Sequence, residues 1–199
     1  MKNILSLLLL LSLTTRAQTT SSTTIYLVRH AEKVTDDPTN KDPALTESGE
    51  NRAIALVKTL EKTAINNIYS TNYKRTTATA MPLAKKLKKE IKFYDLKELK
   101  TEGEVILKNN KGKIALIVGH SNTVLETIEA LGGKRPLEGI FDQEYDFLFQ
   151  LTIAPDGTMN IKVMHYGESN SYSEGEQMIH NRYSSASFFL PFYKIIRTL

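Results

Sequence analysis

Apolar and polar positions along the chain form blocks that predict strands followed by helices. Two unbroken apolar runs, "TIYLVRH" and "KIALIVGH", predict buried β-strands that end at His30 and His120. Between them, "LTESGENRAIALVKTLEK" has apolar residues at helical spacing, with Thr46 as a plausible N-cap. Because strands alternate with helices, we expect a mainly parallel sheet covered on both faces.

The remaining segments extend the same pattern and then change it. "INNIYST" and "IKFYD" predict short strands, and "SNTVLETIEAL" a helix, whereas residues 96–110 are only weakly helical. "YKRTTATAMPLAKKLKK" predicts a helix that Pro82 should kink or restart. Residues 144–167 contain two segments of alternating apolar and polar residues on either side of a Pro-Asp-Gly turn, which predicts an antiparallel hairpin. We therefore predict a three-layer α/β/α sandwich, with its domain spanning residues 24–167.

The two ends of the chain do not fit this domain. Lys2, an apolar run and Thr15-Arg16-Ala17 predict a secretory signal peptide over residues 1–17. Its apolar run is too short to span a bilayer, so an exported protein, periplasmic or secreted, without stable membrane insertion is expected. Residues 168–199 form an extension of unassigned role, whose apolar residues 188–196 either pack on the domain or associate with the envelope.

Composition narrows the possible chemistry. The 199 residues include no cysteine, which excludes disulfides, thiolate metal sites and thiol catalysis. The formal net charge is +4, and basic and acidic residues are interspersed along the chain. The densest basic cluster, residues 85–92, is predicted to be mostly the solvated face of a helix. Nucleic-acid binding is therefore not expected, and the pattern leaves the oligomeric state open.

Two predicted strands end in histidine, and arginines accompany these ends. In open α/β sheets ligands bind outside the carboxyl ends of the strands, so His30 and His120 would face one crevice if their strands are neighbours. Arg29 can join His30 only where the strand stops, because adjacent side chains in a strand point to opposite faces. Arg75 follows another strand end and opens a helix.

Two arginines and two histidines suit a phosphoryl group. Guanidinium groups bind phosphate oxygens in a bidentate manner, and the helix start after His120, including Ser121 and Asn122, would add donors. A neutral His30 could attack phosphorus if its other ring nitrogen donates to a backbone carbonyl, while a protonated His120 would hold phosphoryl oxygens. No metal-ligand spacing such as HExxH is present, and neither metal nor cofactor is expected.

Four ordered motifs, "LVRHAE", "LTESG", "YSTNYKRTTATA" and "IVGHSNTV", resemble those of the histidine phosphatase superfamily. This superfamily includes the phosphoglycerate mutase-like enzymes, and the chain is most similar to its short bacterial phosphatases. The resemblance covers roughly residues 24–155. It implies that His30 is the phosphorylated nucleophile and that Arg29, Arg75 and His120 complete the phosphate pocket. Ala31 departs from the family's usual glycine and could crowd this corner.

The proton donor for the leaving group is less clear. Mutase-like members supply a glutamate after the second arginine, and Glu98 in "DLKELKTEGE" matches it best. Its rivals are Glu102, Asp95 and Glu32, and a surface helix position for Glu98 is equally compatible with the sequence. Further acidic residues of unassigned role are Asp142, Glu144 and Asp146.

The expected function is an exported, metal-independent phosphomonoesterase acting through a phosphohistidine. Only a strand, a helix and a strand fit between Arg75 and His120, so an open, shallow site without a helical cap is expected. Its substrates would be phosphorylated small molecules, glycans or phosphoproteins. The alternatives are a catalytically idle phosphate-binding or interaction protein on the same fold, or a phosphoglycerate mutase-type phosphotransferase.

Overall fold

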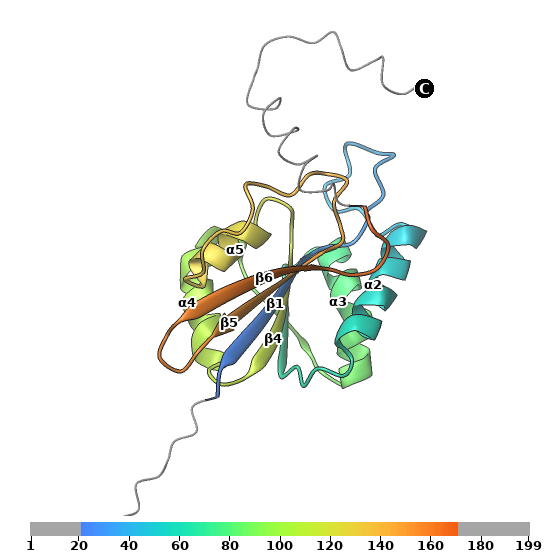
Figure 1. Ribbon diagram of the computed structural model, residues 1–199. Helices are drawn as coiled ribbons and strands as arrows, with labels where there is room; N and C mark the ends of the chain where they lie inside the picture. The colour runs from blue at the N-terminus through green and yellow to red at the C-terminus, as the bar shows by residue number, and fades with distance from the viewer. Residues whose placement is uncertain (1–20, 171–199) are drawn as a thin grey trace, which may run out of the picture.

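The computed structural model describes residues 21–170 and contains one mixed sheet (Figure 1). Within these residues the strand order is β3-β2-β4-β1-β5-β6. The strands are β1 (Thr23–Arg29), β2 (Asn67–Ser70), β3 (Ile91–Phe93), β4 (Ile114–Gly119), β5 (Phe147–Ile153) and β6 (Met159–His165). The first four are mutually parallel, whereas β5 runs antiparallel to β1 and forms a hairpin with β6.

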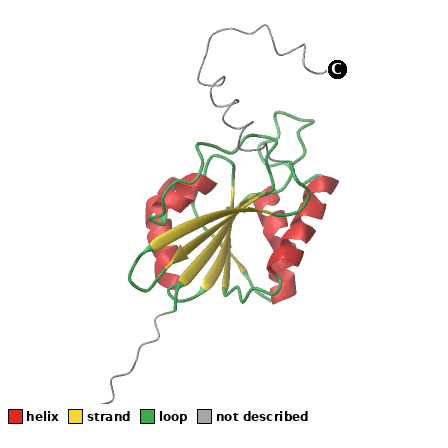
Figure 2. Ribbon diagram, viewed as in Figure 1, coloured by secondary structure: helices red, strands yellow, loops and turns green. Residues whose placement is uncertain are grey.

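Helices cover both faces of this sheet, which confirms the predicted three-layer sandwich (Figure 2). α2 (Glu47–Leu60) and α3 (Lys74–Leu87) lie on one face, and α4 (Leu99–Asn109) and α5 (Val124–Ala130) on the other (Figure 1). A short 3-10 turn, η1 (Leu96–Glu98), precedes α4. As expected, Thr46 caps α2, its hydroxyl accepting a hydrogen bond from Gly49 N at 3.1 Å.

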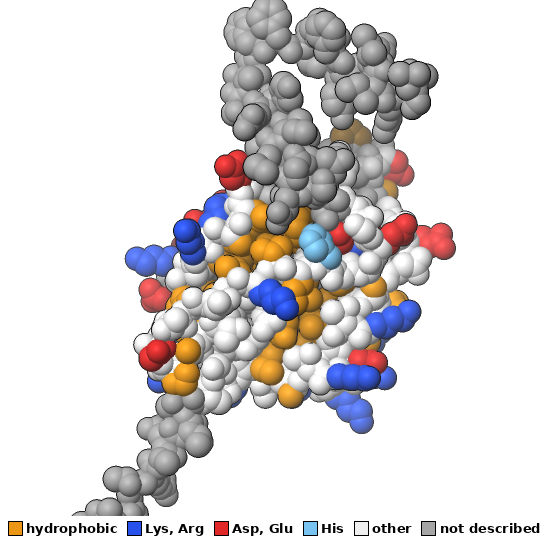
Figure 3. Space-filling model, viewed as in Figure 1, with side chains coloured by type: hydrophobic (Ala, Val, Ile, Leu, Met, Phe, Trp, Pro, Cys, Tyr) orange, Lys and Arg blue, Asp and Glu red, His pale blue; other side chains and the backbone are white. Residues whose placement is uncertain are grey.

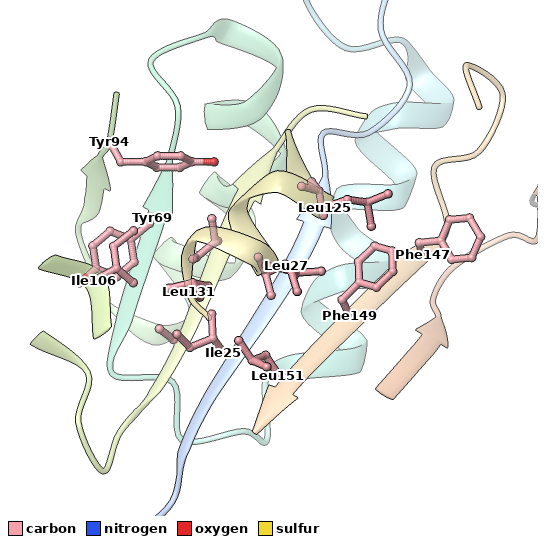
Figure 4. Close-up of a cluster of buried hydrophobic side chains, with 14 of the residues drawn as sticks. Ile25, Leu27, Tyr69, Tyr94, Ile106, Leu125, Leu131, Phe147, Phe149 and Leu151 are labelled. Atoms are coloured by element: carbon pink, nitrogen blue, oxygen red, sulfur yellow. The ribbon is translucent and has the colours of Figure 1, made fainter. Parts of the chain in front are cut away.

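Strand side chains alternate between two hydrophobic cores. Ile25 and Leu27 of β1 face α4 and α5, in the cluster that Figure 4 shows, and Val28 faces α2 and α3. The same alternation in β4 sends Ile117 to the first core and Val118 to the second. Strands β1 and β4 therefore contribute apolar side chains to both cores, and each of these strands is buried on both faces.

α3 continues through Pro82 as one helix from Lys74 to Leu87, so of the two predicted outcomes, a kink or a restart, the restart is excluded. Ala80 precedes Pro82 and Leu83 and Ala84 follow it, and all three are buried against the sheet. Tertiary packing on both sides of the proline therefore holds the two segments as one helix, despite the loss of an internal hydrogen bond.

The predicted signal peptide, residues 1–17, lies outside the described residues, and so does the C-terminal extension beyond residue 170. Among residues 21–170, no helix combines the length and the apolar character needed to cross a bilayer. On the face seen in Figure 3, basic and acidic side chains are interspersed around exposed apolar ones.

Candidate active site

The carboxyl ends of β1 and β4 lie side by side and bring the two predicted histidines together. Arg29 is in register with Gly119, and His30 N donates to Gly119 O at 2.8 Å just beyond the last strand residue. The ring centroids of His30 and His120 are 5.4 Å apart, with an interplanar angle of 66°. β1 ends at Arg29, so His30 stands at the strand-to-loop corner that the sequence predicted.

His30 is held as a neutral imidazole with one nitrogen free for chemistry. Its Nδ1 lies 2.7 Å from Ala31 O, and a carbonyl can only accept, so Nδ1 carries the proton and Nε2 has the lone pair. Burial lowers the pKa of His30 to about 3, with the positive charges of Arg29 and Arg75 and the nearby His120 acting in the same direction. At neutral pH the ring is therefore uncharged, with its lone pair on Nε2.

Ala31 fits the corner without backbone strain. Its side chain is fully buried, and its N–H donates to Thr79 Oγ1 at 2.9 Å. Among the described non-glycine residues, only Lys88 has a positive φ, so the backbone at Ala31 does not require glycine. The methyl group that replaces the family's glycine is thus accommodated.

Arg29 is enclosed by the loop that precedes β5. Its Nη1 lies 2.7 Å from Phe141 O, 3.2 Å from Asp142 O and 2.9 Å from Glu144 O. The guanidinium carbon lies 4.1 Å from the centroid of the Tyr145 ring, in a cation–π arrangement. These contacts occupy Nη1 and one face of the group, while the buried Nε–H has no protein acceptor.

Arg75, in the first turn of α3, reaches the same site from the other side. Its Nη2 lies 3.3 Å from His120 Nδ1, and its guanidinium carbon lies 4.6 Å from the Tyr73 ring centroid. Nε and Nη1 are buried and have no hydrogen-bond acceptor, although Nη1 lies 3.7 Å from Asp42 Oδ1. Because unsatisfied buried donors are costly, these guanidinium N–H groups favour an anionic ligand.

A chain of hydroxyl groups fixes the orientation of His120. The single proton of Thr76 Oγ1 is directed at the carbonyls of Thr71 (2.9 Å) and Tyr73 (3.0 Å), so Thr76 Oγ1 must accept the proton of Thr71 Oγ1 at 3.0 Å. Thr71 Oγ1 in turn accepts from His120 Nε2–H at 2.9 Å. His120 Nδ1 is then the acceptor that faces Arg75.

Burial and the charges of Arg75, Arg29 and Lys33 lower the pKa of His120 to about 4. The free protein therefore holds His120 neutral at pH 7. The predicted protonated form requires the negative charge of a bound phosphoryl group, which would raise this pKa.

The predicted helix start after His120 differs in detail. α5 begins only at Val124, and the N–H groups of Thr123 and Val124 both donate to His120 O, at 3.1 and 2.9 Å. Those donors consequently serve the turn rather than a ligand. Ser121 and Asn122 line the pocket, and substrate binding by them stays a prediction.

Together these residues enclose a pocket of about 300 Å³ at the carboxyl edge of the sheet. It is lined by Arg29, His30, Lys33, Tyr73, Arg75, Leu96, His120, Ser121, Asn122 and Asp142. A larger hollow of about 590 Å³ lies near the start of β1, but arginine and histidine are missing from its lining. Within residues 21–170, no cluster of three or more histidines and carboxylates could hold a metal ion.

Glu98 is the predicted site residue that the structure does not bring to the others. It lies exposed in η1 and does not line the pocket. Glu102 instead accepts from Asp95 N at 3.4 Å, and Glu32 forms an ion pair with Arg52 at 2.8 Å. The pocket-lining carboxylate in the described part of the chain is that of Asp142, 3.8 Å from Arg29 Nη2.

Two other acidic residues that the sequence left unassigned are buried. Glu144 Oε2 accepts from Phe141 N at 2.7 Å and so shapes the loop around Arg29. Asp146 Oδ2 lies 3.1 Å from Nδ1 of the half-exposed His165. Sequence reasoning missed Tyr145 altogether, and it missed the contacts of Thr71, Thr76 and Thr79, although these three belong to the quoted motif "YSTNYKRTTATA".

Residues 25–102 match the model of the histidine phosphatase superfamily (branch 1). No curated protein matches the sequence significantly. The sequence match, together with the solved structures that share the fold, confirms the resemblance to this superfamily.

Similar solved structures include a mycobacterial glucosyl-3-phosphoglycerate phosphatase, with 12% identity, a TM-score of 0.57, and coverage of 74% of this chain and 100% of that one. The protein histidine phosphatase SixA in complex with tungstate has 14% identity, a TM-score of 0.56, and coverage of 71% and 96%. Phosphoglycerate mutase from Bacillus anthracis has 16% identity, a TM-score of 0.57, and coverage of 73% and 93%. At these identities the structures show a common fold, and with the family match they support a phosphatase-type enzyme.

Proposed function

We propose that this protein is an exported, metal-independent phosphomonoesterase that forms a phosphohistidine on His30. The observation that carries the proposal is the combination of a neutral His30, with Nε2 available, and buried guanidinium N–H groups without protein acceptors in the same small pocket. Export rests on the predicted signal peptide alone, and N-terminal sequencing of the protein recovered from outside the cytoplasm would test it.

In the first step, the Nε2 lone pair of His30 attacks phosphorus and the bond from phosphorus to the leaving oxygen breaks. The bond's electron pair leaves with that oxygen, which must take up a proton. Arg29 and Arg75 neutralise the phosphoryl oxygens, and their charge cannot be lost at accessible pH. In the second step, water attacks phosphorus and the bond from phosphorus to Nε2 breaks, with its electron pair returning to Nε2. The water oxygen leaves in inorganic phosphate, one water proton stays on the phosphate or passes to solvent, and the ring is neutral again.

The structure provides little help for the leaving group. The Asp142 carboxylate is 93% exposed, and its one recorded partner is Arg29 Nη2, at 3.8 Å. A solvated carboxylate of this kind is not oriented as a general acid must be. We therefore expect the best substrates to be those whose leaving groups need little protonation, namely aryl phosphates and the phosphohistidine of proteins. Phosphohistidine is named in the description of a similar SixA structure from Agrobacterium tumefaciens.

The test is hydrolysis of an aryl phosphate by the purified protein in the presence of EDTA. We expect turnover that vanadate inhibits and an acid-labile phosphoryl-enzyme that His30→Ala abolishes. His165→Ala is the matched control, since His165 is half-exposed and outside the pocket. Activity that EDTA removes, or that survives His30→Ala, would refute the mechanism. Phosphate binding without turnover would favour the idle protein, and transfer to phosphoglycerate would favour the mutase.

A further inference from the structure

The phosphate pocket continues into a groove along the edge of the sheet. Tyr73 and Leu96 line both the pocket and a neighbouring hollow of about 530 Å³. Phe93 lines this hollow and a further one of about 470 Å³ between α3 and β3. We call these two hollows the β3 groove. Its outer part is lined by Thr77, Met81, Ala84, Lys85, Lys88, Lys89, Glu90, Ile91 and Phe93.

Exposed apolar side chains are concentrated along this groove. Tyr73, Met81 and Phe93 are 39%, 36% and 55% exposed, and they are three of the six large apolar side chains that are exposed in residues 21–170. They follow one another from the phosphate pocket to the outer hollow. A row of exposed apolar groups leading out of a pocket is typical of a surface that binds the remainder of a large ligand.

The groove also follows an open strand edge. In the described sheet β3 pairs only with β2, so its other side is free. Tyr94 N donates to Ser70 O on the β2 side, and strand alternation therefore turns the N–H and C=O of Phe93 toward the open side. Such groups can form hydrogen bonds with the main chain of an extended polypeptide. A glycan or a lipid has no regular main chain of N–H and C=O groups that could pair with them.

The charge of the outer hollow is basic. Lys85, Lys88 and Lys89 line it together with a single carboxylate, that of Glu90, and all four residues are exposed. Carboxylates of a ligand would be attracted to these ammonium groups, and phosphoryl oxygens to the pocket at the other end. The inner hollow, by contrast, is lined by Asp95 and Glu102 together with Lys97. The charges therefore favour an elongated ligand whose acidic residues lie at the outer hollow and not beside the pocket.

We propose that the β3 groove binds an acidic, extended segment of a phosphorylated polypeptide whose phosphoryl group occupies the pocket. This inference rests on the proposed phosphatase function and adds the class of substrate. Lys85 in the last turn of α3 and Lys88 at its C-cap follow Arg75 by 10 and 13 positions, or about 15 to 20 Å at roughly 1.5 Å per residue. An extended chain covers that distance in about five or six residues, so the acidic residues stand that far from the phosphorylated one.

The experiment compares phosphotyrosine peptides that carry three glutamates five to seven residues from the phosphotyrosine, on either side, with peptides carrying glutamines there. We expect kcat/KM about tenfold higher for one acidic peptide, mostly through KM, which is the order that a few exposed ion pairs supply. The double variant Lys85→Glu/Lys89→Glu should abolish this preference while leaving hydrolysis of a small aryl phosphate unchanged. The matched control is Lys108→Glu/Lys111→Glu, because both residues are exposed at the hollow near the start of β1.

The possible failures are distinguishable. If the unmodified protein does not hydrolyse aryl phosphates, the phosphatase function is refuted. If it does, but kcat/KM is equal for acidic and neutral peptides, only the binding of an acidic polypeptide in the β3 groove is refuted. The unphosphorylated acidic peptide should bind to the protein in fluorescence anisotropy and lose binding in the Lys85→Glu/Lys89→Glu variant. If a sulfated oligosaccharide of equal charge competes as well as this peptide, the assignment to a polypeptide is wrong.

Discussion

Replacing Thr71 by valine should disorient His120 without changing the shape of the site. Thr71 is buried, and its hydroxyl accepts from His120 Nε2–H at 2.9 Å and donates to Thr76 Oγ1 at 3.0 Å. Valine is nearly isosteric, so the change removes the acceptor and leaves a buried ring N–H without a partner. Such a loss costs about 1–3 kcal/mol, and for a domain of this size each kcal/mol lowers Tm by about 2–4 °C.

The catalytic effect follows from the same hydrogen bond. With no acceptor at Nε2, His120 is free to rotate or to change tautomer, and Nδ1 is no longer held beside Arg75. If the lost 1–3 kcal/mol is expressed in the transition state, kcat/KM for an aryl phosphate falls by about 5- to 150-fold. ¹⁵N NMR of the imidazole should show the Nε2–H tautomer in the unmodified protein and a mixture in the variant.

Thr127→Val is the matched control for this prediction. Thr127 is equally buried and donates to Thr123 O at 2.7 Å, but it does not line the pocket. We expect a similar fall in Tm with kcat/KM within about twofold of the unmodified value. The reasoning is refuted if Thr71→Val retains kcat/KM within twofold and His120 keeps a single Nε2–H tautomer.

Three further predictions follow from the site. The lowered pKa values of His30 and His120, about 3 and 4, mean that the unfolded chain binds protons first, so their contribution to stability is complete above pH 6.5 and is lost as pH falls toward 4 and 3. Urea unfolding at pH 7, 6 and 5 should show each histidine contributing a slope of up to about 1.4 kcal/mol per pH unit, and His120→Gln should reduce that slope. Glu98→Gln should leave kcat/KM within about twofold, and Asp142→Asn should lower it less than about fivefold. In the unmodified protein and in both variants, kcat/KM should fall steeply from aryl to alkyl phosphates. A selective loss of alkyl phosphate hydrolysis in either variant would identify that residue as the general acid. Arg29→Lys should lower kcat/KM about 100-fold, because the ammonium group of lysine cannot bind the loop carbonyls and a phosphoryl oxygen together. Steady-state kinetics measures the loss, a Tm measurement checks that the variant is folded, and a much smaller loss would contradict this role of Arg29.

The sequence was sufficient for the layers and for the position of the site. Apolar runs marked β1 and β4, and Arg29 and His30 on one strand and His120 on the other stand where those runs stop. Parallel strands place their carboxyl ends at one edge, so the missing facts were that β1 and β4 are neighbours and that β2, which precedes Arg75, lies beside β4. Local patterns and one topological rule therefore predicted the gathering of the four residues.

The surroundings of Arg29 could not be predicted in the same way. Its acceptors are the backbone carbonyls of Phe141, Asp142 and Glu144, more than 110 positions along the chain. Any residue type offers a carbonyl, so this contact leaves no mark in the amino-acid sequence. Tyr145 is a detectable aromatic residue, but only the folded loop shows that its ring lies against the guanidinium.

The acid assignment was weak for a different reason. The identification of Glu98 relied on a distance along the chain from the second arginine, and η1 presents this residue to solvent. A 3-10 turn changes the direction of successive side chains by about 120°, so an error of one or two positions decides whether a carboxylate faces a pocket. Leu96, two positions earlier, is the residue of this turn that lines the pocket.

The site separates permanent charge from adjustable charge. Arg29 and Arg75 keep their positive charge at any accessible pH, and this charge helps to hold the buried imidazoles of His30 and His120 neutral. Under the proposed function, a bound phosphoryl dianion would reverse that influence, because its negative charge would lie among the same four groups. It favours proton uptake on His120, whose Nδ1 already faces the pocket side, while the Nδ1–H of His30 remains bonded to Ala31 O. In the proposed mechanism the two histidines therefore take different roles, His30 as nucleophile and His120 as a ligand-induced cation, because their Nδ1 atoms have different hydrogen-bond partners.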